Sequence, residues 1–221
     1  LSSRSGQSRS SGLPPVTAGF SWVMPHFSRP VWPHCDSPAP EAVAGERDAC
    51  GVGFLAQLSG EPSHGLLAQA LHGLHCMEHR GGCGGDGDSG DGAGILCGIP
   101  WPYLEAVWPA ARSEQSRPRG LAMLFLPADA ERRAVARALC EQAAAGLGLR
   151  SIGWREVPVA PEVLGPLARQ TAPTIEQWLV EGEVAGDALE ALLFRCRRRV
   201  GDLVREAWGP GPSDLYFASF S

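Results

Sequence analysis

Apolar and polar residues alternate along this chain with two different periods, and the two kinds of segment interleave from residue 50 onward. Short apolar or alternating runs predict strands over residues 50–58, 95–99, 121–126, 153–159, 174–180 and 215–220. Helical spacing predicts helices over residues 63–79, 102–108, 129–145, 161–169 and 187–208, with Ser63, Asp129 and Asp187 as N-caps. Interleaved strands and helices indicate a layered α/β or α+β domain.

Two of the predicted helices have recognisable faces. In the helix over residues 129–145, Val135, Leu139 and Gln142 are in phase and mark the expected inner side. The helix over residues 187–208 carries Arg195, Arg197, Arg198 and Arg199, and we interpret this basic run as a solvated side of the helix.

Residues 1–49 differ from the rest, because they are rich in Ser, Pro and Arg and have neither period. We interpret them as a disordered leader or propeptide before a domain over residues 50–221. Arg-rich, acid-poor sequence is also typical of a transit peptide, which would occupy residues 1–35, and Met24 is a plausible start. The chain stops inside its last predicted strand, so we expect the domain to be incomplete at its C-terminus.

Composition narrows the function classes. All 19 basic residues are Arg, which excludes lysine Schiff-base and P-loop chemistry from this polypeptide. The net charge of −5 does not favour binding to nucleic acid, which is itself negatively charged. The 7 cysteines form no CxxC pair, which favours a reducing compartment and thus the cytoplasm, with the plastid as the alternative. No apolar run is long enough to predict a membrane span.

Cys50 is the strongest candidate for catalysis, because a small residue precedes it and a glycine-punctuated apolar run follows. If the chain were cut after Ala49, Cys50 would carry both a thiol and a free α-amine. An α-amine titrates near pH ~7.7–8.0, so it could serve as the general base for its own thiol. The alternative interpretation is an inert cysteine buried in a strand.

A glycine-rich segment over residues 81–94 is the second signal. It lacks the P-loop pattern, and the positions after Asp86 and Asp88 do not complete an EF-hand. Cys76, Cys83 and Cys97 are poorly spaced for zinc. The remaining interpretation is a catalytic-site loop packed against the first strand, in which Asp86 and Asp91 accept hydrogen bonds from loop N–H groups.

Three segments together resemble a known family: residues 50–54 (Cys-Gly-Val-Gly-Phe), 77–81 (Met-Glu-His-Arg-Gly) and 90–95 (Gly-Asp-Gly-Ala-Gly-Ile). They are similar to the start of the glutaminase domain of the glutamate synthase large subunit, a class II glutamine amidotransferase. Residues 154–159 and 215–221 add to the resemblance. It implies a four-layer αββα N-terminal nucleophile fold, incomplete here.

The resemblance also implies roles for individual residues. Cys50 would be the nucleophile that opens glutamine through a γ-glutamyl thioester. Arg80 and Gly81 would bind substrate or organise the loop, and a purely structural Arg80 is equally open. His79 is interpreted as structural. The oxyanion-stabilising and main glutamine-binding groups would lie beyond Ser221, so we expect the chain alone to be inactive or nearly so.

Cofactors and partners follow from the same resemblance. None is expected in this chain, whereas the complete parent enzyme would carry FMN and an iron–sulfur cluster. Expected partners are glutamine, the remaining synthase domains, and a small reductase subunit or ferredoxin, with no nucleic acid and no membrane. The alternatives are the amidotransferase domain of another enzyme, such as amidophosphoribosyltransferase, or a non-catalytic remnant that acts as an interaction module.

Overall fold

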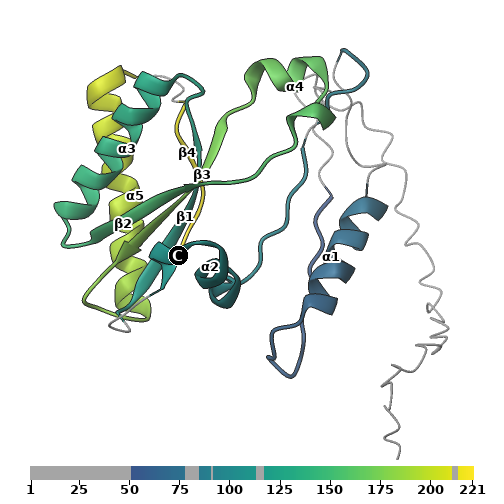
Figure 1. Ribbon diagram of the computed structural model, residues 1–221, viewed down its shortest axis with the longest axis horizontal. Helices are drawn as coiled ribbons and strands as arrows, with labels where there is room; N and C mark the ends of the chain where they lie inside the picture. Colours follow the sequence, from purple (N-terminus) through teal and green to yellow (C-terminus); the bar gives the residue numbers. More distant parts are fainter. Residues whose placement is uncertain (1–50, 78–84, 91, 113–116, 211–213) are drawn as a thin grey trace, which may run out of the picture. The chain divides into compact units, whose positions relative to one another are not determined.

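The computed structural model describes residues 51–77, 85–90, 92–112, 117–210 and 214–221. All of them fall within one unit, Asp48–Ser221. The helices are α1 (His64–Cys76), α2 (Trp101–Val107), α3 (Ala130–Ala145), α4 (Pro166–Thr171) and α5 (Asp187–Trp208), with 3-10 turns η3 (Pro109–Ala111) and η4 (Pro161–Val163) (Figure 1). The strands are β1 (Arg119–Leu126), β2 (Arg150–Glu156), β3 (Thr174–Glu181) and β4 (Tyr216–Phe220).

The four strands form one sheet in the order β2-β3-β1-β4, and each neighbouring pair is antiparallel. Bulges interrupt the ladder between Met123 and Leu124 and between Ser151 and Gly153. Because no pair is parallel, the α+β alternative holds for this sheet and the α/β alternative does not.

One face of the sheet is covered by α3 and α5, which lie side by side (Figure 1). Ala122 of β1 pairs with Trp178 of β3, and both point into this layer and are fully buried. The indole of Trp178 also stacks on Trp154, with ring centroids 5.2 Å apart. This layer is the main hydrophobic core.

The opposite face is packed against α2. The next residues along the two strands, Leu121 and Leu179, pair with each other and contact Leu104 and Trp108. Successive side chains on a strand point to opposite faces, so this alternation places α2 on the side away from α3 and α5. Both faces of β1 and β3 are therefore buried. The continuous apolar run of residues 121–126 in β1 predicts this, whereas β3 buries the polar residues Glu176, Gln177 and Glu181.

The helix faces agree only in part with their sequence patterns. Arg195, Arg197, Arg198 and Arg199 are exposed on α5, which confirms the solvated basic side. In α3 the buried residues are Ala136, Cys140, Ala143 and Ala144, while Val135 is exposed, so the predicted inner face is rotated by one residue. Small side chains at this face let α3 approach the sheet closely.

Asp129 caps α3 by accepting from the Arg132 N–H, and Ser63 caps α1 by accepting from the Leu66 N–H, both as predicted. The third predicted cap is wrong. Gly186 occupies the N-cap of α5 with φ 59°, and Asp187 is the first helical residue. A carboxylate there still complements the positive end of the helix dipole.

Other predicted bounds need correction. The described part of 50–58 is not a strand, and neither is 95–99. Val52 and Phe54 are more than nine-tenths exposed and no described segment pairs with them, so the apolar pattern is present without a partner to form a ladder. Strand β2 begins and ends three residues earlier than predicted, and Leu164 and Gly165 divide the predicted helix 161–169 into η4 and α4.

Among the described residues, no helix is both long and apolar enough to cross a membrane.

Candidate active site

The residues that the sequence marks as the site, Cys50, Arg80 and Gly81, lie outside the described residues, as do His79 and Asp91. What the structure describes are the segments next to them in the chain. Residues 51–57, which follow Cys50 in the chain, have no regular secondary structure. Helix α1 comes next and precedes the glycine-rich segment, of which residues 85–90 and 92–94 are described.

Asp86 is the most heavily bonded side chain of the described loop. Its Oδ1 accepts from the backbone N–H groups of Asp88 at 3.2 Å and Ser89 at 2.9 Å. Its Oδ2 accepts from the Ser89 hydroxyl at 2.6 Å and from the Leu167 N–H at 3.0 Å. The bonds from Ser89 and Leu167 hold the pKa of Asp86 well below its usual range. The carboxylate is therefore an acceptor and not an acid, which confirms its interpretation as a partner of loop N–H groups.

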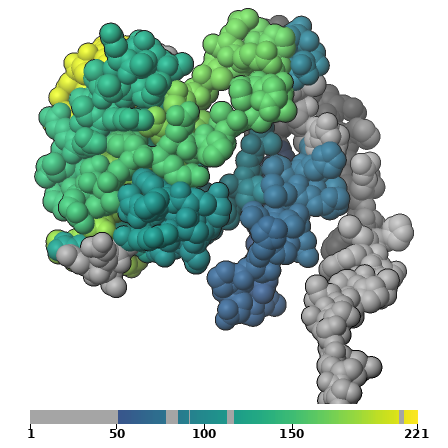
Figure 2. Space-filling model, in the orientation of Figure 1, coloured from purple at the N-terminus to yellow at the C-terminus, as the bar shows by residue number. Residues whose placement is uncertain are grey.

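Ser89 is the functional candidate that sequence reasoning missed. It is buried, and its Oγ accepts from the Ala168 N–H at 3.0 Å while it donates to Asp86. In the space-filling view, the light green residues around α4 abut blue residues of the preceding loop (Figure 2). The spacing Asp-x-x-Ser is a turn signal that predicts the local bonds, but no local pattern predicts a contact 79 positions away.

Metal binding finds no support in the described residues. They contain no group of three or more His, Cys, Asp or Glu side chains arranged to hold an ion. The Asp86 carboxylate is directed at N–H and O–H donors, and Cys140 and Cys196 are buried in the core between α3, α5 and the sheet. The cysteines described here do not form a ligand set for a cluster.

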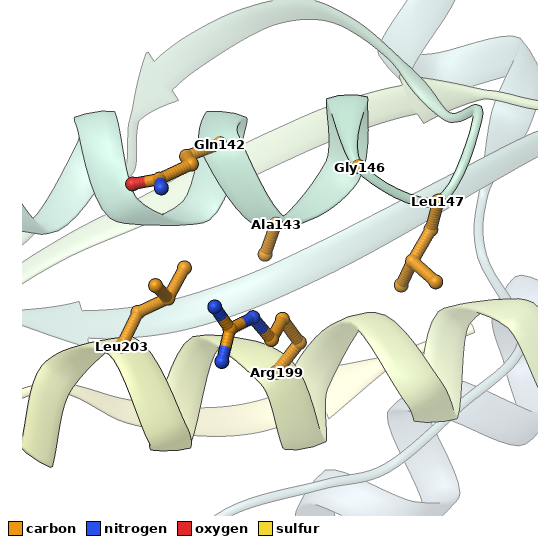
Figure 3. Close-up of a pocket in the computed structure, with 6 residues that line it drawn as sticks. All are labelled: Gln142, Ala143, Gly146, Leu147, Arg199 and Leu203. Atoms are coloured by element: carbon orange, nitrogen blue, oxygen red, sulfur yellow. The ribbon is translucent and has the colours of Figure 1, made fainter. Parts of the chain in front are cut away.

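A groove of about 370 Å³ lies between α3 and α5 (Figure 3). The side chain of Arg199 projects from α5 toward Ala143 of α3, and it also contacts the Glu206 carboxylate at 3.3 Å. The lining residues are Gln142, Ala143, Gly146, Leu147, Arg199 and Leu203. They include no cysteine, histidine or carboxylate, so the groove offers no nucleophile or acid.

Comparison with known proteins identifies the class. The family model described as glutamine amidotransferases class-II matches residues 50–221, which is most of the chain. The chain therefore belongs to the class II glutamine amidotransferases.

Within this class, the chain is similar to glutamate synthases. The chain is 43% identical over 189 residues to ferredoxin-dependent glutamate synthase 1, chloroplastic/mitochondrial, of Arabidopsis thaliana, a match that covers 82% of this chain and 11% of that protein. It is 47% identical over 182 residues to ferredoxin-dependent glutamate synthase 2 of Synechocystis sp., with 80% of this chain and 11% of that protein covered. The chain thus spans only about a ninth of the length of these relatives.

Proposed function

We propose that this chain is the start of the glutamine-hydrolysing part of a glutamate synthase, with Cys50 as its N-terminal nucleophile. The observation that carries the proposal is where the family match begins. The class II model starts at Cys50, the residue that the sequence alone marks as a thiol able to become a chain terminus. Identities of 43% and 47% to glutamate synthases support that enzyme over the amidophosphoribosyltransferase alternative.

The proposed reaction uses Cys50 alone for covalent chemistry. Scission of the Ala49–Cys50 peptide bond frees the α-amine, which takes the thiol proton. The sulfur then attacks the side-chain amide carbon of glutamine, the C–N bond breaks, and the amine returns the proton to the departing ammonia. Water hydrolyses the γ-glutamyl thioester, so glutamine and water become glutamate and ammonia.

Arg80 and Gly81 are proposed to organise the loop or to bind the substrate. A guanidinium suits either role, because it can pair with a carboxylate in two hydrogen bonds or donate to several backbone carbonyls. Both residues lie in the segment that leads to Asp86, whose bonds fix the following turn.

The four-layer αββα arrangement is also a proposal. The described residues provide one sheet, with α3 and α5 as the helical layer on one face. Val52 and Phe54 are two residues apart and are 92% and 93% exposed. This period-two pattern supports a strand that pairs only when the rest of the domain is present, and it would belong to the second sheet.

For the complete parent, we propose that the ammonia serves a synthase domain that carries FMN and an iron–sulfur cluster. Ferredoxin becomes the proposed electron donor in place of a reductase subunit, because the similar proteins are named as ferredoxin-dependent. We propose that other parts of the complete parent hold both groups, as the resemblance to glutamate synthases implies. The proposed compartment is the cytoplasm, and the plastid is the alternative because relatives include chloroplastic proteins.

The test is a glutaminase assay on the complete protein with Cys50 replaced. Cys50→Ala should abolish ammonia release, and Cys50→Ser should retain at most a small fraction of it. Cys97→Ala is the matched control, since Cys97 is an exposed cysteine of the same region and should be dispensable. Undiminished ammonia release by Cys50→Ala would refute the proposal.

A further inference from the structure

The glycine-rich loop is joined to a distant segment by two side chains. Asp86 Oδ2 accepts from the Leu167 N–H at 3.0 Å, and Ser89 Oγ accepts from the Ala168 N–H at 3.0 Å. Asp86 and Leu167 are 81 residues apart in the sequence, and Ser89 and Ala168 are 79 residues apart. The Ser89 hydroxyl donates to Asp86 at 2.6 Å, which couples the two contacts into one unit. We call Asp86, Ser89 and the two N–H groups of α4 the loop clamp.

The N-terminus of α4 leaves room for Asp86 and Ser89 to bind its N–H groups. The N-cap of α4 is Gly165, which offers no side chain to the first N–H groups of the helix. A Cβ at Gly165 would lie 2.5 Å from Ser89 Oγ and 2.6 Å from the Ser89 nitrogen. Only glycine admits so close an approach, and the cap that α4 lacks locally is supplied by Asp86 and Ser89.

A loop with this composition needs such a contact to hold one conformation. Residues 81–94 contain 8 glycines, and glycine loses more conformational freedom on ordering than any other residue. Fixing one residue's backbone costs roughly 1–2 kcal/mol, so a long glycine-rich segment needs contacts that oppose this loss. Gly81 precedes Asp86 by five positions, so the clamp is close in sequence to the residues proposed for the site.

We propose that Asp86 and Ser89 are positioning residues of the amidotransferase site, which hold the glycine-rich loop in its working conformation by clamping it to α4. This inference rests on the proposed function, because it is the glutaminase reaction that the loop serves. Neither residue touches substrate in the proposal. They act through the part of the loop that carries Arg80 and Gly81.

The first experiment tests the clamp itself in the complete protein. In Asp86→Ala, hydrogen exchange of the α4 peptide should accelerate by at least about 10-fold, because the Leu167 N–H loses its acceptor and the Ser89 hydroxyl, which accepts from Ala168, loses the carboxylate that holds it. Gly165→Ala should have the same effect by pushing Ser89 away. Asp88→Ala is the control, because Asp88 is exposed and the described residues give its side chain no hydrogen bond or ion pair. Unchanged exchange in Asp86→Ala would overturn the clamp.

The second experiment tests whether Asp86 and Ser89 position the glycine-rich loop for the glutaminase reaction. In Asp86→Ala and Ser89→Ala, kcat/KM for glutamine hydrolysis per intact site should fall about 10- to 100-fold, as expected for a small displacement of reacting groups. Sites are counted by titration with a glutamine-mimicking electrophile, so a loss of folded protein alone would leave this ratio unchanged. Asp86→Asn keeps one acceptor oxygen and should recover part of the loss.

The outcomes separate this inference from the proposed function. Faster exchange in α4 with unchanged kcat/KM per site would reduce the clamp to a structural contact and overturn the inference, while the Cys50 mechanism would stand. Ammonia release that persists in Cys50→Ala would instead refute the mechanism, and the positioning role would be rejected with it. A fall in kcat/KM for Asp88→Ala as large as for Asp86→Ala would also overturn the inference.

Discussion

Arg137 of α3 binds Glu176 of β3 with two hydrogen bonds, from Nε to Oε2 at 2.8 Å and from Nη2 to Oε1 at 2.5 Å. Glu176 is 1% exposed, so its charge is held almost entirely by this guanidinium and by Arg133, whose Nε lies 3.7 Å from Oε1. The hydrogen bonds that Arg137 donates to Glu176 raise the pKa of Arg137. This ion pair fixes α3 on the sheet.

Replacing Arg137 by methionine should therefore destabilise the chain. The variant keeps an unbranched apolar stem without the guanidinium, and it leaves the buried Glu176 carboxylate with Arg133 as its more distant partner. Removing one member of a buried pair costs about 3–5 kcal/mol, and we expect about 1–3 kcal/mol here because Arg137 is partly exposed and Arg133 remains. Urea denaturation followed by tryptophan fluorescence measures the loss.

The matched control is Arg199→Met, which removes an arginine from the exposed pair with Glu206. Its effect should stay below about 0.5–1 kcal/mol, since exposed pairs contribute little. Equal losses in the two variants would show that burial of Glu176 does not matter.

Gly120 should not tolerate a methyl group. A Cβ there would lie 2.7 Å from Leu193 Cδ1 and 3.3 Å from Val180 Cγ2, so Gly120→Ala should overpack the core and cost about 1–3 kcal/mol of unfolding free energy. Gly201→Ala is the control on α5, where a Cβ would meet only the end of Arg205 at 3.9 Å. That variant should gain about 0.5–1 kcal/mol from helix propensity. The same urea titration compares them, and a stabilising Gly120→Ala would contradict the packing of β1 on α5.

The two core cysteines should make the fold sensitive to alkali. Burial raises the pKa of the Cys196 thiol to about 12 and raises that of Cys140 well above its usual range. Well below about pH 8.5, the ordinary thiol pKa, both thiols are protonated in the folded and unfolded chain. As the pH rises from there toward 12, only the unfolded thiols ionise, so the free energy of unfolding should fall.

Comparing stability at about pH 8 and about pH 10, on either side of the ordinary thiol pKa, checks this expectation. The double variant Cys140→Ala, Cys196→Ala should lose stability from its cavity but show a smaller decline between the two pH values. Cys76→Ala, at an exposed cysteine, should decline like the original chain. An unaltered decline in the double variant would assign the alkaline effect to other groups.

This chain alone should release ammonia from glutamine at least about 100-fold more slowly than the complete protein. The reason is the proposed location of the oxyanion-stabilising groups beyond Ser221, and loss of one such donor typically costs about 10²–10³ in rate. A coupled ammonia assay on both proteins measures the ratio. Comparable rates would mean that the residues up to Ser221 suffice.

Prediction from sequence succeeds where local pattern and packing agree. Asp129 begins α3 as expected, and the apolar run of β1 is buried on both faces because α2 and α5 cover it. The predicted inner face of α3 is one residue away from the observed one. The small side chains of its alanines and Cys140 approach the sheet more closely than Val135 could. The bulge between Ser151 and Gly153 accompanies the shift of β2, and a bulge leaves little trace in the hydrophobic period.

The candidate site depends more on non-local contacts, and there sequence is a weaker guide. The pattern around Phe54 predicts a strand, but a strand needs a neighbour, and no described residue provides one. The acceptor role of Asp86 follows from its local turn and was predictable. Its bond to Leu167 joins segments 81 residues apart, and no local rule could find it. The chemistry of Cys50 came from residue type and neighbours, and it stays a prediction.

The mature N-terminus of the complete, active protein tests the central claim most directly. Mass spectrometry of its N-terminal peptide should find a chain that begins with Cys50, Gly51 and Val52, with residues before Cys50 removed. A fully active glutaminase in which the bond between Ala49 and Cys50 is intact would contradict the account.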